Sequence, residues 1–414
     1  MAVVEVRYRY RLRVSSSQQR QLGDVFDACR AVWNTALGRW SDLWRHEDLS
    51  LGYADADREL TDWRGRFEWL GAQPSVPQQQ VLRDLYRAIS AFFDTANPAG
   101  RPRFKSRKAR YATARWTRNG FKVSGTGVGV GTNDRLDVAV AGGRVALRVV
   151  WSRPLPSVPT SVTVFRDRAG RWWASYVCRV ALPDVPVAPT GRSTGLDVGL
   201  TTFATTEDAD SDVANPRFAK AAAKSLARSQ RHLARKKKGS AGRAKARRRK
   251  ATVEARTANQ RADWQHKTAR KLMGVYDRIG VEDLRVKNMS RSGKGRRKVG
   301  LNRSIADAGW AAFRKVLAWQ AIKAGKTVVA LPARDTTQKC SSCGAKAKPR
   351  IELCDRVFSC RCCGLVLGRD RNAARNLNPD RYGVSVGGTK PAGKAVPVGD
   401  NGTKTEDPKG VLAA

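Results

Sequence analysis

Residues 340–344, Cys-Ser-Ser-Cys-Gly, and residues 360–364, Cys-Arg-Cys-Cys-Gly, contain two CxxC knuckles whose nearest cysteines are separated by 16 residues. Two such turns can each direct two thiolates at one tetrahedral Zn²⁺ ion, and a glycine after the second cysteine eases the tight turn. Four protein ligands leave no open position for water or substrate, so such a site is structural. We therefore predict one structural zinc ion held by four thiolates, those of Cys340, Cys343, Cys360 and Cys363.

The other four cysteines are not needed as ligands. Cys354 lies between the knuckles, and Cys362 lies inside the second knuckle, where it is an alternative to Cys360 in the ligand assignment. Cys29 and Cys178 lie in apolar patterns and are expected in hydrophobic cores. Six of the eight cysteines fall between residues 340 and 363. This clustering favours a metal site in a reducing cytosol over a disulfide scaffold.

The composition indicates a polyanionic partner. The 414 residues leave room for two to four domains, and 41% hydrophobic residues with 12 Trp are enough to fill their cores. Lys and Arg total 79 against 36 Asp and Glu, a net charge of +43. Such self-repulsion is hard to sustain in a compact protein without a polyanion. The sequence has no apolar run near the roughly 20 residues that span a bilayer, and its charged N-terminus excludes a signal peptide. We therefore expect a cytoplasmic nucleic-acid-binding protein, without membrane attachment, in a bacterial cell and on the nucleoid when bound to DNA.

The first half of the chain changes from helices to strands. Basic and apolar residues alternate over 5–13, which is typical of a half-exposed strand. Serines at 15–17 offer an N-cap for a helix whose apolar stripe runs to about Arg45. Helical patterns follow at 57–69 and 77–95. From 120 to 180, short apolar runs separated by Gly-Gly and Ala-Gly turns predict β-hairpins.

The second half alternates strands and helices. Strands are expected at 194–207, with a hairpin partner, and at 278–281 and 327–331. Helices are expected around 305–324 and at 371–377. From residue 383 onward the chain is rich in Gly, Pro, Thr and Lys without apolar periodicity, so 383–414 is expected to be disordered.

Two basic segments are candidate nucleic-acid contacts. Residues 101–110 are Arg-Pro-Arg-Phe-Lys-Ser-Arg-Lys-Ala-Arg, and residues 220–250 contain 14 Lys or Arg and no acidic residue. Gly239, Ser240 and Gly242 interrupt the second run, which predicts a helix, a break and a second helix to about Val275. A charge run is often only a solvated face, but this uncompensated excess favours phosphate contact. The candidates are Lys105, Arg107, Lys108, Arg235, Lys236, Lys237, Lys238, Arg247, Arg248 and Arg249.

Three carboxylates stand out in so basic a chain. Asp197 lies inside the apolar segment 195–199, Glu282 follows the apolar residues 279–281, and Asp370 lies at the start of the helix expected at 371–377. Carboxylates from separate elements that converge at one sheet edge can hold two Mg²⁺ or Mn²⁺ ions for phosphodiester hydrolysis. The alternative is that Asp370 is only a helix-start acid and Glu282 one half of a surface ion pair.

Taken together, these motifs resemble a known family. The chain resembles the TnpB proteins of bacterial transposons and their relatives, the miniature type V CRISPR effectors, from residue 8 to about 380. The resemblance is carried by WNTAL at 33–37, RPRFKSRK at 101–108, GLDVGL at 195–200, NQRADWQHK at 259–267, VEDL at 281–284 and TTQKCSSCG…CRCCGLVLGRDRNAARNL at 336–377.

The resemblance implies an α/β plus β fold. It predicts an RNase H-like nuclease domain of the RuvC type with an inserted zinc ribbon, preceded by a β-barrel wedge domain that a helical recognition domain interrupts. The implied boundaries are wedge strand 1–14, helical domain 15–99, wedge barrel 100–190, nuclease domain 191–335 with a basic hairpin at 220–275, zinc ribbon 336–366, last nuclease motif 367–382 and tail 383–414.

The resemblance also implies the catalytic residues. The three acids of the family map onto Asp197, Glu282 and Asp370. Two positions depart from the common pattern: Gly368 stands where many relatives have Asp, and Asp335-Thr-Thr-Gln338 replaces Tyr-Thr-Ser-Gln. Neither departure removes a predicted ligand, so we expect an active enzyme.

The function that the resemblance implies is an RNA-guided DNA endonuclease that hydrolyses phosphodiesters with two Mg²⁺ or Mn²⁺ ions. Its implied partners are a guide RNA and double-stranded target DNA with a short flanking motif. One alternative is a non-cleaving RNA-guided binding protein or transposition accessory factor. Another is a strand-transferring transposase. The sequence does not distinguish a transposon from a CRISPR origin, or a monomer from a homodimer.

Overall fold

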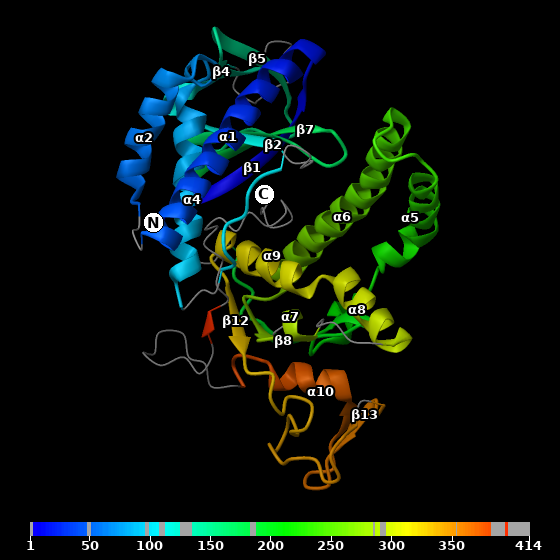
Figure 1. Ribbon diagram of the computed structural model, residues 1–414. Helices are drawn as coiled ribbons and strands as arrows, with labels where there is room; N and C mark the ends of the chain where they lie inside the picture. Colours follow the sequence, from blue (N-terminus) through cyan, green and yellow to red (C-terminus); the bar gives the residue numbers. More distant parts are fainter. Residues whose placement is uncertain are drawn as a thin grey trace. The chain divides into compact units, whose positions relative to one another are not determined.

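The computed structural model describes residues 3–47, 51–95, 99–106, 112–124, 135–182, 188–284, 286–289, 295–352, 354–381 and 394–395. Figure 1 shows their helices and strands in sequence colours. The chain divides into two compact units, with the boundary between Ala181 and Leu182. Each unit is built around its own β-sheet.

The first unit contains a seven-stranded antiparallel sheet. Its strands are β1 (Val3–Arg13), β2 (Ala112–Thr117), β3 (Phe121–Ser124), β4 (Arg135–Val140), β5 (Gly143–Val150), β6 (Ser161–Arg166) and β7 (Trp172–Ala181). The order is β2-β6-β7-β1-β5-β4-β3. The alternation predicted for β1 is confirmed, because Val6, Tyr8, Tyr10 and Leu12 are buried.

The two edge strands of this sheet are neighbours in the chain. Only the single 3₁₀ turn Arg118–Gly120 joins β2 to β3, so the sheet must curl to bring its edges together. The buried Trp116 of β2 spans this gap, since its Nε1 donates to the carbonyl of Ala139 in β4 at 3.0 Å. No β2–β3 ladder is formed among the described residues.

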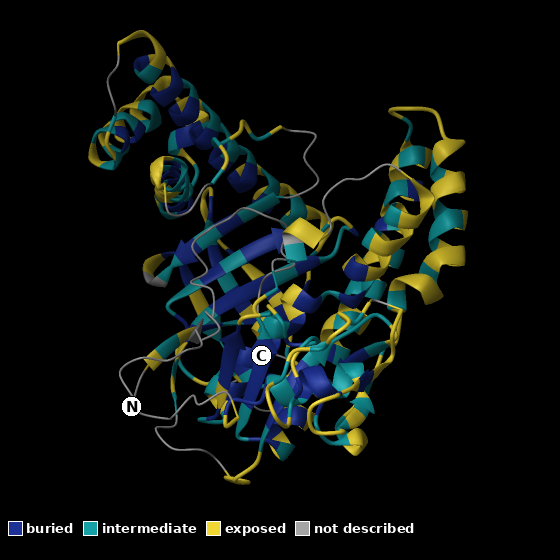
Figure 2. Ribbon diagram, turned by 90° about the horizontal axis from the view of Figure 1, so that it is seen from below, coloured by how far each residue is buried: buried dark blue, intermediate teal, exposed yellow. Residues whose placement is uncertain are grey.

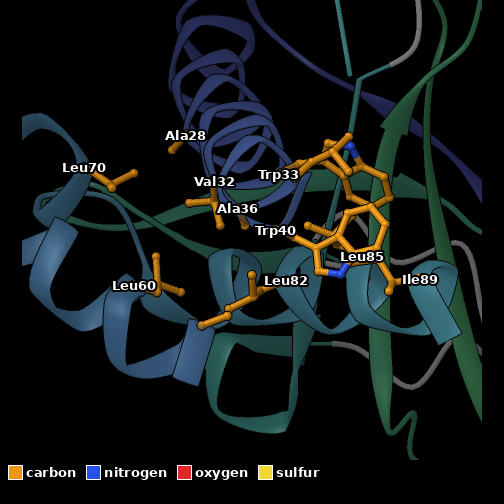
Figure 3. Close-up of a cluster of buried hydrophobic side chains, with 12 residues drawn as sticks. Ala28, Val32, Trp33, Ala36, Trp40, Leu60, Leu70, Leu82, Leu85 and Ile89 are labelled. Atoms are coloured by element: carbon orange, nitrogen blue, oxygen red, sulfur yellow. The ribbon is translucent and has the colours of Figure 1, made fainter. Parts of the chain in front are cut away.

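Helices are inserted between β1 and β2. They are α1 (Ser16–His46), α2 (Tyr53–Arg66), α3 (Glu68–Gly71) and α4 (Ser75–Phe93). Ser15 is the N-cap of α1 and forms a capping box with Gln18. Trp33 and Trp40 pack with leucines of α2 and α4 in one hydrophobic cluster (Figure 3). Trp33 is thus a core residue, and so is Trp116 of the sheet.

The second unit contains a mixed six-stranded sheet. Its strands are β8 (Ser193–Val198), β9 (Thr202–Thr205), β10 (Val213–Ala214), β11 (Arg278–Glu282), β12 (Thr327–Leu331) and β15 (Lys394–Ala395), in the order β10-β9-β8-β11-β12-β15. Strands β8, β11 and β12 are parallel. The disorder expected for 383–414 does not hold for Lys394–Ala395, which pair with β12. The other residues from 383 onward lie outside the described part.

Helices α5 (Phe218–Ala234) and α6 (Ala241–Val275) form a hairpin between β10 and β11. The break between them covers 235–240, which includes Gly239 and Ser240 of the predicted interruption but not Gly242. None of the 17 residues of α5 is buried, and Figure 2 shows the hairpin largely in the colours of exposed and intermediate residues. Asp307 anchors its base. The Asp307 carboxylate accepts hydrogen bonds from the backbone N–H groups of Ala219 (2.8 Å) and Lys220 (3.1 Å) and from Arg261 of α6 (3.0 Å).

The helix expected around 305–324 is two helices. The structure has α7 (Val286–Met289), α8 (Arg296–Ala308) and α9 (Trp310–Lys323). Gly309 separates the last two, and its φ of +67° lies in the left-handed region that ends a helix. The amide of the buried Gln265 in α6 donates to the Gly309 carbonyl at 3.2 Å, so α6 holds this junction.

A buried ion pair anchors the starts of β11 and β12. Lys326, whose side chain is 2% exposed, lies 2.9 Å from the carboxylate of Asp277. Asp277 also accepts hydrogen bonds from the backbone N–H groups of Thr190 and Gly191. Burial alone would raise the pKa of Asp277, but these donors together hold it below its usual value.

The segment after β12 contains the knuckles, the two-stranded sheet β13 (Val357–Ser359) and β14 (Val366–Gly368), and α10 (Arg369–Asn376). Cys340, Cys360 and Phe358 form its small buried core. We call residues 336–368 the ribbon. Its last strand runs directly into α10.

Candidate active site and zinc ribbon

Asp197 and Glu282 lie on neighbouring parallel strands. The register pairs Gly280 with Gly195 and Val281 with Leu196. One step further along both strands, Glu282 comes beside Asp197. Residues two apart on a strand share a face, so both carboxylates lie on the face that carries Gly195 and Gly280. This position is at the carboxyl ends of β8 and β11, where open α/β sheets bind their ligands.

The two glycines bring α10 onto this same face. A Cβ atom added at Gly195 would lie 2.6 Å from the carbonyl carbon of Leu377 and closer still to the carbonyl oxygen of Ala374. A Cβ atom at Gly280 would collide with the carbonyl oxygen of Leu377. Only glycine therefore permits the end of α10 to rest directly on the sheet. This contact delivers Asp370, in the first turn of α10, to the side of Asp197 and Glu282.

The electrostatics of these residues reflect their proximity. Burial, and then the charges of Glu282 and Asp370, raise the pKa of Asp197 well above its usual value, and Arg369 partly opposes this. Burial also raises the pKa of Glu282, against the hydrogen bond from Thr336. A buried carboxylate whose pKa is raised by two neighbouring carboxylates favours a bound cation, and oxygen ligands suit a hard divalent one.

Two of the three acids accept hydrogen bonds from neighbouring side chains. Arg369 donates to Oδ1 of Asp370 at 3.1 Å, and the Thr336 hydroxyl donates to Oε1 of Glu282 at 2.9 Å. Asp283 points away toward α9, where Arg314 pairs with it at 3.1 Å. This separates Asp283 from the acid cluster, as strand alternation predicts.

The four predicted zinc ligands converge. Sγ of Cys340 lies 3.6 Å from Sγ of Cys363, and Sγ of Cys343 lies 3.5 Å from Sγ of Cys360. A tetrahedral site with Zn–S bonds of about 2.3 Å requires S···S separations of about 3.8 Å. The four thiolates therefore fit a structural zinc ion.

Cys354 and Cys362 are exposed and lie outside the cluster. Among the described residues, the thiols of Cys340, Cys343, Cys360 and Cys363 are the only group of three or more His, Cys, Asp or Glu side chains whose ligand atoms all lie within 4.8 Å of one another. The three carboxylates are thus near each other without meeting that distance.

Two asparagines of α10, which sequence reasoning missed, clamp the start of the ribbon. The amide of the fully buried Asn372 donates to the Lys339 carbonyl at 2.7 Å and accepts from the Ser341 N–H at 2.9 Å. The Asn376 amide donates to the carbonyls of Thr336 and Lys339, each at 2.8 Å. The available signal was their i, i+4 spacing, which places both side chains on one face of a helix.

The basic candidates differ in their exposure. Arg235 and Lys236–Lys238 lie at the end of α5 and in the following turn, and they are exposed, as are Arg248 and Arg249 on α6. Arg247 is half-buried. Arg107 and Lys108 lie outside the described residues.

Lys105 is occupied within its own unit. Its Nζ lies 3.6 Å from the centre of the Trp33 ring, and burial lowers its pKa to about 8. The Asn34 side chain fixes the Lys105 backbone through its N–H (2.7 Å) and its carbonyl (3.0 Å). The Lys105 side chain packs against α1 in this structure, so it would have to leave Trp33 to contact phosphate as expected.

The charge run on α5 forms a stripe. Its exposed basic residues recur at three- and four-residue steps, which places them on one face: Lys220, Lys224, Arg228, Arg231 and Arg235. His266 of α6, by contrast, lies 3.4 Å from Gln320 of α9 and contacts a neighbouring helix. Trp264 packs edge-on against Phe203 at 4.7 Å.

Family models match three parts of the chain. A model described as "Probable transposase" (OrfB_IS605) matches residues 175–293, "Cas12f1-like, TNB domain" matches 310–377, and a helix-turn-helix domain of the OrfB_IS605 type matches 1–48. These matches define a class of transposon-encoded proteins related to small CRISPR effectors.

Similar proteins cover nearly the whole chain. A Streptomyces pristinaespiralis protein named "Putative RNA-guided DNA endonuclease" is 35% identical over 91% of this chain and 89% of its own length. The Escherichia coli K12 protein of that name with the suffix InsQ is 34% identical over 89% and 90%. The chain therefore belongs to the TnpB-like (OrfB, IS605) family, as its motifs predict.

A solved structure shares the fold. The Cas12f1 chain in a cryo-EM structure of the Cas12f1-sgRNA-target DNA complex matches 87% of this chain and 82% of its own, with a TM-score of 0.52 and 12% identity. In the described parts of the chain, no helix is long and apolar enough to cross a membrane.

Proposed function

We propose that this protein is an RNA-guided, divalent-metal-dependent DNA endonuclease with a single active site made by Asp197, Glu282 and Asp370. The observation that carries the proposal is the close seating of α10 on Gly195 and Gly280, which gathers three carboxylates on one sheet face. Membership of a family whose relatives are named for this activity supports it.

The sheet of the second unit corresponds, in this proposal, to a RuvC-type nuclease domain over 191–335 and 367–382, with the zinc ribbon inserted. The curled sheet of the first unit corresponds to the wedge, and α1–α4 to the recognition helices that interrupt it. The barrel assignment is supported by the short β2–β3 connection.

The acids would hold two Mg²⁺ or Mn²⁺ ions, which would activate the attacking water and stabilise the leaving 3′ oxygen. Arg369, paired with Asp370, balances part of the negative charge of the cluster. Thr336 fixes one oxygen of Glu282, so that its carboxylate has a defined orientation. Arg314 holds Asp283 away from the site.

The basic surfaces would hold the nucleic acids. We assign guide RNA and double-stranded target DNA as partners, with the exposed basic residues of the α5–α6 hairpin among the phosphate contacts. The guide would supply the sequence recognition by base pairing, and the protein would read a short flanking motif and the backbone of the hybrid.

Guide dependence tests this function. Protein expressed with its native flanking DNA should carry a structured RNA, and it should cleave at physiological salt only a DNA that matches this RNA and contains the flanking motif. Non-specific binding should weaken about 10³–10⁵-fold between 50 and 200 mM salt if six to ten phosphates are contacted. Efficient cutting of any sequence by RNA-free protein at physiological salt would refute the proposal.

Substitution of the acids tests the site. Asp197→Ala, Glu282→Ala and Asp370→Ala should each lower cleavage by at least about 10³-fold, because a metal ligand that stabilises the transition state by several kcal/mol is lost. Binding of the guide–target hybrid should persist. Asp283→Ala is the matched control and should keep most of the activity. An essential Asp283 with a dispensable Glu282 would contradict the assignment.

A further inference from the structure

Each end of the ribbon contacts one of the proposed catalytic acids. At its start, the Thr336 hydroxyl donates to Glu282 at 2.9 Å, and Thr336 is only 5% exposed. At its end, β14 continues without a linker into α10, whose second residue is Asp370. Two of the three acids are therefore positioned by the two ends of a single insertion.

The two ends are also fixed to each other. Asn376 of α10 donates to the carbonyl of Thr336 itself, at 2.8 Å. Arg369 donates through its backbone N–H to the Arg356 carbonyl at 2.9 Å, which continues the β13–β14 pairing to the first residue of α10. Deeper in the ribbon, the thiolates of Cys340 and Cys363 come from the first and second knuckles, so a bound zinc ion would join the start of the insertion to its end.

The Thr336 hydroxyl has one proton and two acceptors within reach. The Glu282 oxygen is at 2.9 Å and the Ala333 carbonyl at 3.2 Å. The shorter bond goes to the carboxylate, and a hydrogen bond to an ionised acceptor is the stronger kind. Thr336 thus orients Glu282 from outside the sheet, in the way that groups bonded to metal ligands elsewhere fix the orientation of those ligands.

We propose that Thr336 is a positioning residue through which the zinc ribbon sets the orientation of Glu282, so that zinc binding in the ribbon strengthens divalent-cation binding at the three acids. This inference rests on the proposed function of those acids. It assigns the ribbon a role in assembling the active site, in addition to any contact it makes with nucleic acid.

The experiment measures Mn²⁺ binding to the full chain by electron paramagnetic resonance, with zinc content and cleavage recorded in parallel. Thr336→Val, which keeps the shape and removes the hydroxyl, should weaken Mn²⁺ binding by about 10-fold or more and retain its zinc. Thr336→Ser, which restores the hydroxyl, should bind Mn²⁺ close to the wild-type affinity. Thr337→Val is the matched control one residue away and should match the wild type.

A double-mutant cycle tests whether zinc binding acts on Glu282 through Thr336. Cys343→Ser should lose zinc and weaken Mn²⁺ binding, and combining it with Thr336→Val should add little, since both changes release Glu282 from the ribbon. Fully additive effects, or wild-type Mn²⁺ affinity in either Thr336→Val or zinc-free protein, would overturn the proposal. Circular dichroism confirms that each variant is folded.

The readouts separate this inference from the proposed function. If wild-type protein binds Mn²⁺ and Thr336→Val weakens that binding, the coupling stands even if no guided cleavage is found. If guided cleavage is found and Thr336→Val leaves both Mn²⁺ affinity and cleavage unchanged, the coupling fails while the function stands.

Discussion

Gly195→Ala tests whether the close seating of α10 on the sheet assembles the site. Real Cβ atoms keep about 3.0 Å from other heavy atoms, whereas a Cβ here would approach Leu377 to 2.6 Å and the Ala374 carbonyl oxygen more closely. The end of α10 would have to move by about 1 Å. Because the obstacle is backbone, it cannot be relieved by a change of rotamer.

The consequences of this movement are measurable. Overpacking of this kind costs about 1–3 kcal/mol of folding free energy, and a displacement of about 1 Å at reacting groups lowers a rate by about 10²-fold. Urea unfolding and guided cleavage by Gly195→Ala, with Gly280→Ala as a second test of the same contact, give both quantities.

The control is Gly274→Ala on α6, where an added Cβ would meet nothing within 4 Å. It should leave cleavage unchanged and leave stability equal or slightly higher, because Ala is the better helix former. Wild-type cleavage and stability in both Gly195→Ala and Gly280→Ala would refute the argument that glycine is required for the approach of α10.

Two further predictions concern the zinc site and the Asp277–Lys326 pair. The protein should contain about one zinc ion per chain by elemental analysis. Cys360→Ser should release the zinc ion, whereas Cys354→Ser should retain it. Full zinc retention in a Cys340→Ser/Cys360→Ser double variant would contradict the assignment of the zinc ligands. Asp277→Asn should lower the free energy of unfolding at pH 7 by about 3–5 kcal/mol, because it leaves the buried Lys326 charge unpaired. Because the pKa of Asp277 is lowered in the folded protein, the wild type loses the stability from this ion pair as the pH falls below about 4. The free energies of unfolding of the wild type and Asp277→Asn should therefore converge at low pH. A difference between them that stays constant with pH would contradict the pairing.

Local patterns predicted those features whose causes are local. The alternation in β1, the two knuckles and the break in the basic hairpin each depend on neighbouring residues, and the structure confirms them. The positions of Asp197 and Glu282 at strand ends also followed from short apolar runs. The family resemblance added the partner and the activity, which no periodicity indicates.

Features that depend on distant contacts were not predicted. Gly195 and Gly280 are needed because the backbone at Leu377 rests on them, and nothing within a few residues of either glycine reports that contact. Gly309 divides an amphipathic pattern that reads as one helix, since an isolated glycine in such a pattern is often tolerated. Lys105 carries a charge that predicts exposure, but its backbone is bound by Asn34 and its ammonium group lies over Trp33.

The α5–α6 hairpin has a consequence for how the length of this chain can vary. Its connections to the rest of its unit lie at the base, through Asp307 and through Trp264, Gln265 and His266 in the second half of α6, and α5 contributes no buried residue. Deleting matched whole turns from the far ends of both helices, about seven residues from each, would keep the phase of both helices. Such a deletion leaves the sheet and its acids in place and removes mainly positive charge. The hairpin is therefore a segment where shorter and longer versions of this protein can arise at little cost to the fold.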